Sequence, residues 1–157
     1  MGRIHVRAWQ AAYAGVMPDA YLDGLSPDER TDMWGRSIAQ PGPGHVILVV
    51  DDGTGVQGFA ALGPQDADPY QTEIGQLYAV NVDPAAWGRG LGRRLMAGGM
   101  AVLRAQGYRR AVLWVLPENR RARDLYESEG WAADGAERDD DVVGVQVKDI
   151  RYRVALI

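Results

Sequence analysis

The stretch that decides the fold is residues 87–94, which read Trp-Gly-Arg-Gly-Leu-Gly-Arg-Arg. It follows a run rich in β-forming residues over 75–82, and after it apolar residues recur at helical spacing over 91–103. The stretch therefore predicts a glycine-rich turn that leads from the end of a strand into a helix. Such a turn presents unpaired backbone N–H groups and the positive end of a helix dipole, which together suit a bound phosphate.

The glycines and arginines of this turn support the same interpretation. Glycine lets the backbone approach a ligand without a Cβ clash, and arginine adds a fixed positive charge that suits a diphosphate. The alternative is a glycine-rich helix start whose arginines point into water. The turn lacks the Gly-Lys-Ser/Thr of a Walker loop and the Gly-x-Gly-x-x-Gly of a Rossmann unit. The residues expected to hold the anion are Gly88, Arg89, Gly90, Leu91, Gly92 and Arg93.

A second motif covers residues 119–131, Asn-Arg-Arg-Ala-Arg-Asp-Leu-Tyr-Glu-Ser-Glu-Gly-Trp. The two motifs at this spacing resemble the GNAT superfamily of acyl-CoA-dependent N-acetyltransferases. In that family the first segment holds the pyrophosphate of coenzyme A. The second segment carries an Asn and a Tyr near the thioester, before a Gly-aromatic pair that opens the next strand. The resemblance is good over residues 45–157 and looser before them. One departure is Trp87, where the family often has Gln or Arg, at a position that contributes mostly backbone.

Composition places limits on what the chain does. Hydrophobic residues make up 46% of the 157 residues and charged residues 24%, as in ordinary globular proteins, so we expect one domain over residues 1–157. The net charge of −4 argues against general nucleic-acid binding. With no cysteine, and with His5 and His45 far apart, we expect no metal site and no thiol intermediate. Because we find neither a long apolar run nor a signal peptide, we expect a cytoplasmic protein without a membrane partner.

The patterns along the chain predict a mixed α/β fold. Ser26 and Pro27 form a helix start, with the Ser as N-cap and the Pro at the first helical position. Expected helices cover 3–14, 19–25, 27–38, 91–106 and 119–129. Expected strands cover 45–50, 56–62, 73–82, 110–116, 131–136 and 145–155, with residues 139–141 in the last turn.

The resemblance also implies how these elements are arranged in space. It implies a GNAT-like mixed central sheet, flanked by helices, in which the parallel strands 73–82 and 110–116 splay apart. The family usually begins with a β-strand before the first helix, whereas this sequence starts almost directly in the helix; either the strand lies before its first residue or it has been dispensed with. The neighbouring strand would then be an exposed edge, and we expect a second copy of the chain or a loop to cover it.

The resemblance also implies roles for named residues. The backbone of Val80, Asn81 and Val82 would bind the pantetheine arm of acetyl-CoA as an added strand. Asn119 would hold the pantetheine as well as capping its helix. Tyr126 resembles the general acid that protonates the departing thiolate. The two groups are matched, because a phenol has a pKa of about 10 and a thiol one of about 8.5.

The base that takes a proton from the amine is less well defined by the sequence. Glu73, at the start of the central strand, is the candidate, although a bulge in that strand would change which residues share its face. Where several relatives have a glutamate on the neighbouring strand, this chain has Trp114. Water relayed to Glu73, or the hydroxyl of Tyr78, is the alternative. The absence of cysteine favours direct attack by the amine on the thioester.

The acceptor should lie opposite the coenzyme A, near the N-terminal helices and the Asp139–Asp141 turn. We expect a primary amine of a small molecule or of a protein N-terminus. An acyl-CoA-binding domain without turnover, and a nucleotide-binding or interaction module that uses the same turn, are the alternatives. The aromatic-rich group expected near the acceptor comprises Trp9, Tyr13, Met17, Tyr21 and Trp34.

Overall fold

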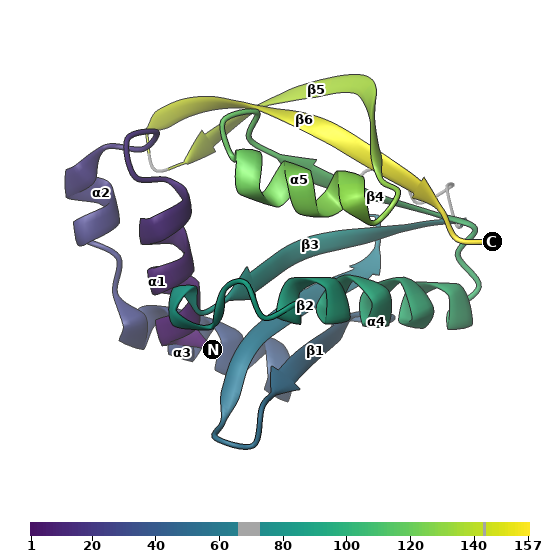
Figure 1. The fold of residues 1–157 in the computed structure, drawn as a ribbon, viewed down its shortest axis with the longest axis horizontal. Helices are drawn as coiled ribbons and strands as arrows, with labels where there is room; N and C mark the ends of the chain where they lie inside the picture. Colours follow the sequence, from purple (N-terminus) through teal and green to yellow (C-terminus); the bar gives the residue numbers. More distant parts are fainter. Residues whose placement is uncertain (66–72, 143) are drawn as a thin grey trace.

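The computed structural model of the chain describes residues 1–65, 73–142 and 144–157. The strands of this part form one mixed sheet in the order β1-β2-β3-β4-β6-β5 (Figure 1). The strands are β1 (Val46–Asp51), β2 (Val56–Pro64), β3 (Ile74–Val82), β4 (Arg110–Val115), β5 (Ala132–Val142) and β6 (Val145–Ala155). The helices are α1 (Gly2–Ala12), α2 (Asp19–Asp23), α3 (Pro27–Ala39), η1 (Pro84–Ala86, 3-10), α4 (Leu91–Ala105) and α5 (Arg120–Ser128). The predicted mixed α/β class is confirmed, and the chain begins in α1 rather than in a strand.

The central strands β3 and β4 are parallel but pair only at one end. Residues 74–76 of β3 lie beside residues 110–112 of β4, and beyond them β4 continues with β6 as its partner. Figure 1 shows β3 and β4 diverging as they run toward α1. Among the described residues, β4 therefore does not pair with β3 beyond Gln76, which leaves the edge of β3 at Val80 and Asn81 open to a ligand.

A β-bulge in β3 lies just where the two strands part. Consecutive residues 61 and 62 of β2 lie opposite residues 79 and 77 of β3, so Tyr78 is an extra residue. Beyond it, Val80 and Val82 pack against the same core as Leu77. Side chains that alternate regularly between the two faces of a strand would put Leu77 on the same face as residues 79 and 81. The bulge at Tyr78 breaks this alternation, so the residues beyond it change face.

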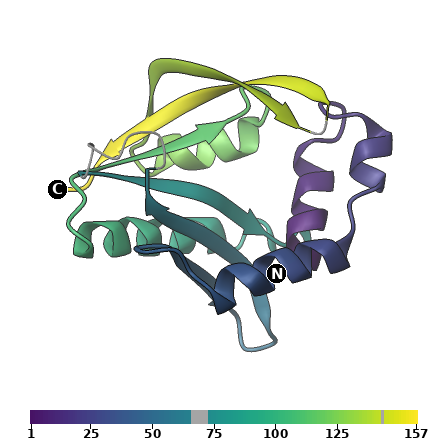
Figure 2. The same cartoon turned by 180° about the vertical axis from the view of Figure 1, so that it is seen from behind.

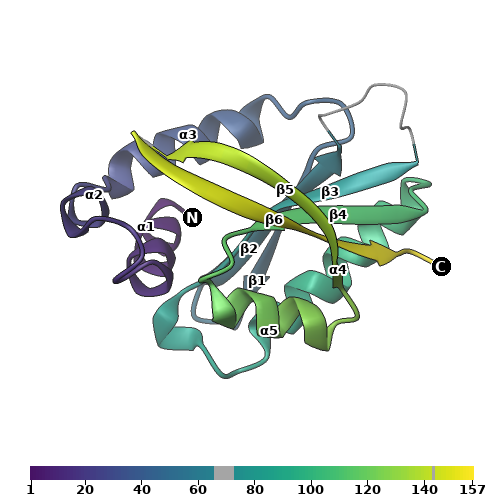
Figure 3. The same ribbon diagram turned by 90° about the horizontal axis from the view of Figure 1, so that it is seen from above.

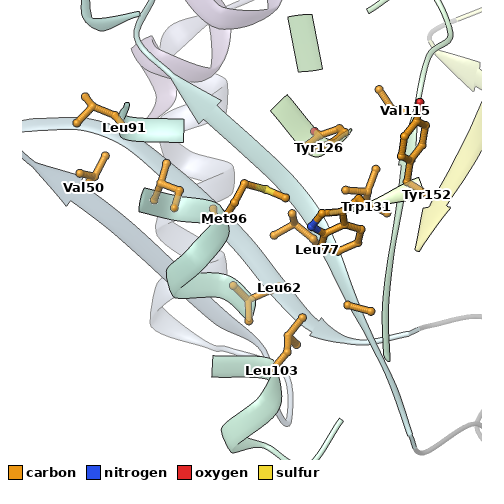
Figure 4. Packing of buried hydrophobic residues seen from close by; sticks show 14 of the residues in the cluster. Val50, Leu62, Leu77, Leu91, Met96, Leu103, Val115, Tyr126, Trp131 and Tyr152 are labelled. Atoms are coloured by element: carbon orange, nitrogen blue, oxygen red, sulfur yellow. The ribbon is translucent and has the colours of Figure 1, made fainter. Parts of the chain in front are cut away.

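Helices cover both faces of the sheet. Helices α4 and α5 lie on one face and α3 on the other, as the views from behind and from above show (Figures 2 and 3). The main core fills the space between α4, α5 and the sheet, and Figure 4 shows Leu62, Leu77, Met96 and Leu103 within it. Met96 is fully buried, and burial of such a side chain contributes about 2 kcal/mol.

A second, smaller core joins the N-terminal helices to the end of the β5–β6 hairpin. Its buried residues include Val6, Met17, Leu22 and Leu116, and Val147 of β6 packs against them. Since α1 also contacts β3, this core fixes the helices across the end where β3 and β4 diverge. Among the described residues, no helix is long and apolar enough to cross a membrane.

One sequence-based expectation is wrong in this region. Asp139–Asp141 lie inside β5, not in a turn, because β5 continues to Val142 and pairs there with Val145. Lys148 on β6 explains this, since its ammonium lies 3.1 Å from Asp139 and 3.5 Å from Glu137. β5 lies at an edge of the sheet, where exposed charges are tolerated and prevent further strand pairing.

Candidate functional site: a cleft between the splayed strands

A cleft of about 980 Å³ occupies the space that the divergence of β3 and β4 leaves open. The turn before α4 lines one end, and residues 78–82 of β3 form one wall. α5 lines the opposite wall, and α1 and the β5–β6 hairpin line the other end. Every predicted coenzyme-binding residue lines this cleft except Arg89.

The turn before α4 leaves backbone donors free. Gly88 and Gly90 both have φ of 76°, the left-handed region that favours glycine. Gly90 is the N-cap of α4 and supplies no side-chain acceptor, so the first amides of α4 lack a partner within the helix. Gly92 serves packing instead, because a Cβ there would lie 3.0 Å from Leu125 Cδ2 on α5.

The arginines of the turn differ in where they point. Arg89 pairs with Asp52 in the β1–β2 turn at 2.8 Å and does not line the cleft. Hydrogen bonds from Thr54, and then from Arg89, hold the pKa of Asp52 well below its usual value. Arg93 does line the cleft, with its Nε 3.5 Å from Glu129.

Trp87 contributes more than backbone, which the sequence did not indicate. Its indole N–H donates to the Val82 carbonyl at 2.9 Å, which ties the turn to the end of β3. The guanidinium of Arg121 on α5 lies 3.9 Å from the Trp87 ring centroid, a cation–π contact. Together these contacts join β3, the turn and α5 around one end of the cleft.

The opposite wall carries Asn119 and Tyr126. The predicted N-cap is confirmed, since Asn119 Oδ1 accepts from the Ala122 N–H at 3.2 Å, while Nδ2 donates to the Tyr13 hydroxyl at 3.4 Å. Tyr126 is buried yet lines the cleft, and its hydroxyl bonds to no described residue. Burial, and then the neighbouring Tyr13, raises the pKa of Tyr126 above its ordinary value. The phenol is therefore fully protonated at neutral pH.

The sequence pattern of the Acetyltransferase (GNAT) family matches residues 6–131. This chain belongs to the GNAT family. The N-acetyltransferase YuaI of Bacillus subtilis (strain 168), itself uncharacterised, is 29% identical over 152 residues, 96% of this chain and 83% of that protein. The mycothiol acetyltransferase of Beutenbergia cavernae is 44% identical over 89 residues, but these are 57% of this chain and 29% of that protein.

Solved structures share the GNAT fold at lower identity. The PaiA N-acetyltransferase of Thermoplasma acidophilum, crystallised with coenzyme A, has a TM-score of 0.72 at 16% identity, over 98% of this chain and 89% of that chain. YncA of Salmonella typhimurium, a putative acetyltransferase crystallised with acetyl-CoA, has a TM-score of 0.72 at 21% identity. The match covers 99% of this chain and 86% of that chain. The splayed sheet described above is thus the fold of the family.

Glu73 is not brought to the cleft of this GNAT domain. It is exposed, at the end of β3 where that strand pairs with β4, and its carbonyl accepts from the Arg109 N–H at 2.9 Å. Because an extended chain rises about 3.3 Å per residue, Glu73 lies about 23 Å along the strand direction from Val80. The alternative candidate, Tyr78, does line the cleft, and its hydroxyl donates to the Pro64 carbonyl.

Helix α1 and the β5–β6 hairpin form the end of the cleft opposite the glycine turn. Of the predicted aromatic-rich group, Trp9, Tyr13 and Met17 line the cleft. Tyr21 packs in the smaller core, and Trp34 lies on the other side of His5, against Phe59.

Sequence reasoning missed two polar residues at this end of the cleft. Asp149 of β6 is only 8% exposed and lines the cleft. Arg138 of β5, directly opposite it in the hairpin, donates to Asp149 Oδ2 from both Nε and Nη2, at 3.1 and 2.9 Å. The signal in the sequence was a single acidic residue in a β-forming run whose other charged residues, Lys148, Arg151 and Arg153, are basic. Within the described ranges, no group of three or more His, Asp or Glu side chains could hold a metal ion.

Proposed function

We propose that this chain transfers an acetyl group from acetyl-CoA to a primary amine by direct attack of the amine on the thioester. One observation carries the proposal: a single cleft joins a phosphate-type turn, an unpaired strand edge and a buried, unpaired tyrosine hydroxyl. The names of its relatives support the same activity, since they include N-acetyltransferases and mycothiol acetyltransferases. The two solved structures named above were crystallised with coenzyme A and acetyl-CoA.

In the proposed complex, the diphosphate lies on the free amides of residues 91–93 at the positive end of α4. Arg93, which lines the cleft there, adds positive charge. The pantetheine arm continues along the open edge of β3 at Val80 and Asn81, in the manner of an added strand. This path leads the thioester from the turn toward Tyr126 and Asn119 on the facing wall.

In the chemical step, the amine nitrogen attacks the thioester carbonyl carbon and the carbon–sulfur bond then breaks. The departing sulfur takes the proton of the Tyr126 hydroxyl, and the nitrogen loses its proton to water in the cleft. The products are an amide and free coenzyme A, and Tyr126 regains a proton from water. The Tyr126 phenol is protonated at neutral pH, as the donor must be, but burial raises its pKa and so moves it away from the match with the thiol that the sequence suggested.

Replacement of Tyr126 by Phe tests this assignment. Because general acids contribute about 10²-fold or more, we expect kcat to fall by about that factor while the affinity for acetyl-CoA is retained. The matched control is Tyr152→Phe, since that hydroxyl bonds to Arg123 and Glu127 and does not line the cleft. Tyr152→Phe should lower stability by about 1 kcal/mol and leave kcat unchanged. Full turnover by Tyr126→Phe at every pH would refute the acid role.

A thermal-shift comparison separates the proposal from its alternatives. Acetyl-CoA at about 100 times its Kd should stabilise the protein by about 2.7 kcal/mol, whereas ATP and NAD should not. Stabilisation by ATP or NAD instead would indicate a nucleotide-binding module. Stabilisation by acetyl-CoA without release of free thiol across a panel of amines would indicate a domain that binds acyl-CoA without turnover.

A further inference from the structure

Asp149 is the buried charge that the proposed chemistry does not use. Both bonds from Arg138 converge on its Oδ2, whereas an arginine and a carboxylate frequently form two parallel bonds, one to each oxygen. No described residue donates to Oδ1. Oδ1 is not among the fully buried polar atoms left without a partner, so it is open to solvent, and a ligand that donates to it would replace water there.

The charges around Asp149 favour a cation as that ligand. Asp140, which also lines the cleft, lies 3.9 Å from Arg138. Arg138 is therefore shared between two carboxylates, and its guanidinium also lies 4.6 Å from the ring centroid of Trp114. Two carboxylates against one guanidinium leave one negative charge at this end of the cleft. The opposite end carries Arg93 and Arg121 together with Asp124, so basic side chains outnumber acidic ones there, whereas acidic side chains outnumber basic ones at this end.

Tyr13 connects Asp149 to the reaction centre. Its hydroxyl accepts the bond from Asn119. Tyr13 and Asp149 line the same cleft, and burial raises the pKa of Tyr13, with a smaller contribution in the same direction from the charge of Asp149. Tyr13 also acts on the pKa of Tyr126. The hydrogen bond to Asn119 thus places Tyr13 on the same wall as the reaction centre, and Asp149 lines the cleft together with these residues.

We infer that the acceptor is a small cationic amine whose ammonium group donates to Asp149 Oδ1 and whose apolar part packs against Trp9 and Tyr13. This inference rests on the proposed function and adds the substrate class to it. Asp149 is a positioning residue: it holds the ammonium, the nitrogen loses one proton to water, and the neutral amine then attacks the thioester. Trp9 and Tyr13 are in edge-to-face contact, with ring centroids 4.8 Å apart, and offer an apolar wall for a hydrophobic group.

Phenethylamine and 2-phenylethanol are suitable probes, because they have nearly the same shape and differ in charge. Calorimetry on the protein saturated with coenzyme A measures binding of each probe without turnover. The unaltered protein should bind phenethylamine about tenfold to hundredfold more tightly, as expected for a hydrogen bond between charged groups. Asp149→Asn should abolish this preference while coenzyme A affinity is retained. Equal binding of the two probes by the unaltered protein, or binding of neither, would overturn the inference without need of a variant.

Asp139→Asn is the matched control, since it removes the same charge from the same hairpin at a side chain that is 78% exposed and pairs with Lys148. Asp139→Asn should change the preference for phenethylamine over 2-phenylethanol by no more than about threefold, because exposed charge pairs contribute little. A preference that survives in Asp149→Asn, or is lost in Asp139→Asn, would also overturn the inference. Failure to bind coenzyme A at the outset would instead contradict the proposed function, so the two failures are distinguishable.

Discussion

His5 illustrates how burial decides the chemistry of a single residue. Its Nδ1 accepts the indole N–H of Trp34 at 3.0 Å, and its ring lies against Trp9 with centroids 5.5 Å apart. An indole N–H only donates, so Nδ1 is unprotonated and the proton of the neutral ring is on Nε2. Burial, and then the positive charge of Arg30, lowers the pKa of His5 from 6.5 to about 4.

This pKa makes stability depend on pH. Between pH 6.5 and 4 the unfolded chain binds a proton at His5 that the folded chain does not, so unfolding becomes easier as pH falls. We expect the free energy of unfolding to drop by up to about 3 kcal/mol from this residue between pH 7 and 4. Urea unfolding of His5→Gln should show a correspondingly flatter pH dependence. His45→Gln, at an exposed position, should keep the dependence of the unaltered protein, and an unchanged slope in His5→Gln would contradict the account.

At the scale of elements, the turn before α4 is where backbone conformation and ligand binding coincide. An aspartate at Gly90 would place a carboxylate at the positive end of α4, where it would compete with the diphosphate. We expect Gly90→Asp to raise the Kd for acetyl-CoA about tenfold to hundredfold, measured by calorimetry.

Gly107→Asp serves as the control for Gly90→Asp, at the opposite end of the same helix. Both glycines have positive φ, 76° and 92°, and a Cβ at either meets nothing within 4 Å. Both variants should therefore lose a similar stability of about 1 kcal/mol. Unchanged affinity in Gly90→Asp, or equal weakening by Gly107→Asp, would show that the turn does not hold the diphosphate.

Elements with strong local signals could be predicted from the sequence. Ser26 caps α3 as predicted and accepts from the Glu29 N–H at 3.2 Å, because capping is a local interaction. The extent of β5 could not be predicted, since its acidic residues are poor strand formers and their partners lie on β6. The bulge at Tyr78 also depends on pairing with β2, which no pattern within β3 reveals.

In the candidate site, too, residues with a local sequence signal could be predicted, and residues whose contacts depend on other elements could not. Gly90, Asn119 and Tyr126 are found from short motifs with a physical rationale, and all three line the cleft. Asp149 and Trp87 were not assigned roles because their contacts depend on strand register and on the path of the turn, as with Arg138 opposite Asp149 and the Val82 carbonyl at Trp87. Glu73 was chosen as a carboxylate at the start of the central strand, and that end of β3 lies away from the cleft because β3 and β4 separate only beyond residue 76.

For the whole molecule, the two cores differ in size and in the part of the cleft that they support. The larger core holds α4 and α5 against the sheet, and the smaller one joins α1 and α2 to the hairpin at the acceptor end. Because a small core opens at lower free energy, we expect amide hydrogens of α1 and α2 to exchange faster than those of α4. Mass spectrometry of exchange checks this order, and equal protection of α1 and α4 would contradict it.

The most direct test of the account is a crystal structure of the protein with acetyl-CoA bound. The account predicts that the diphosphate oxygens accept hydrogen bonds from the amides of residues 91–93. It also predicts that the pantetheine runs beside Val80 and Asn81 and that the sulfur lies next to the Tyr126 hydroxyl. A diphosphate bound away from this turn, or a sulfur far from Tyr126, would contradict it.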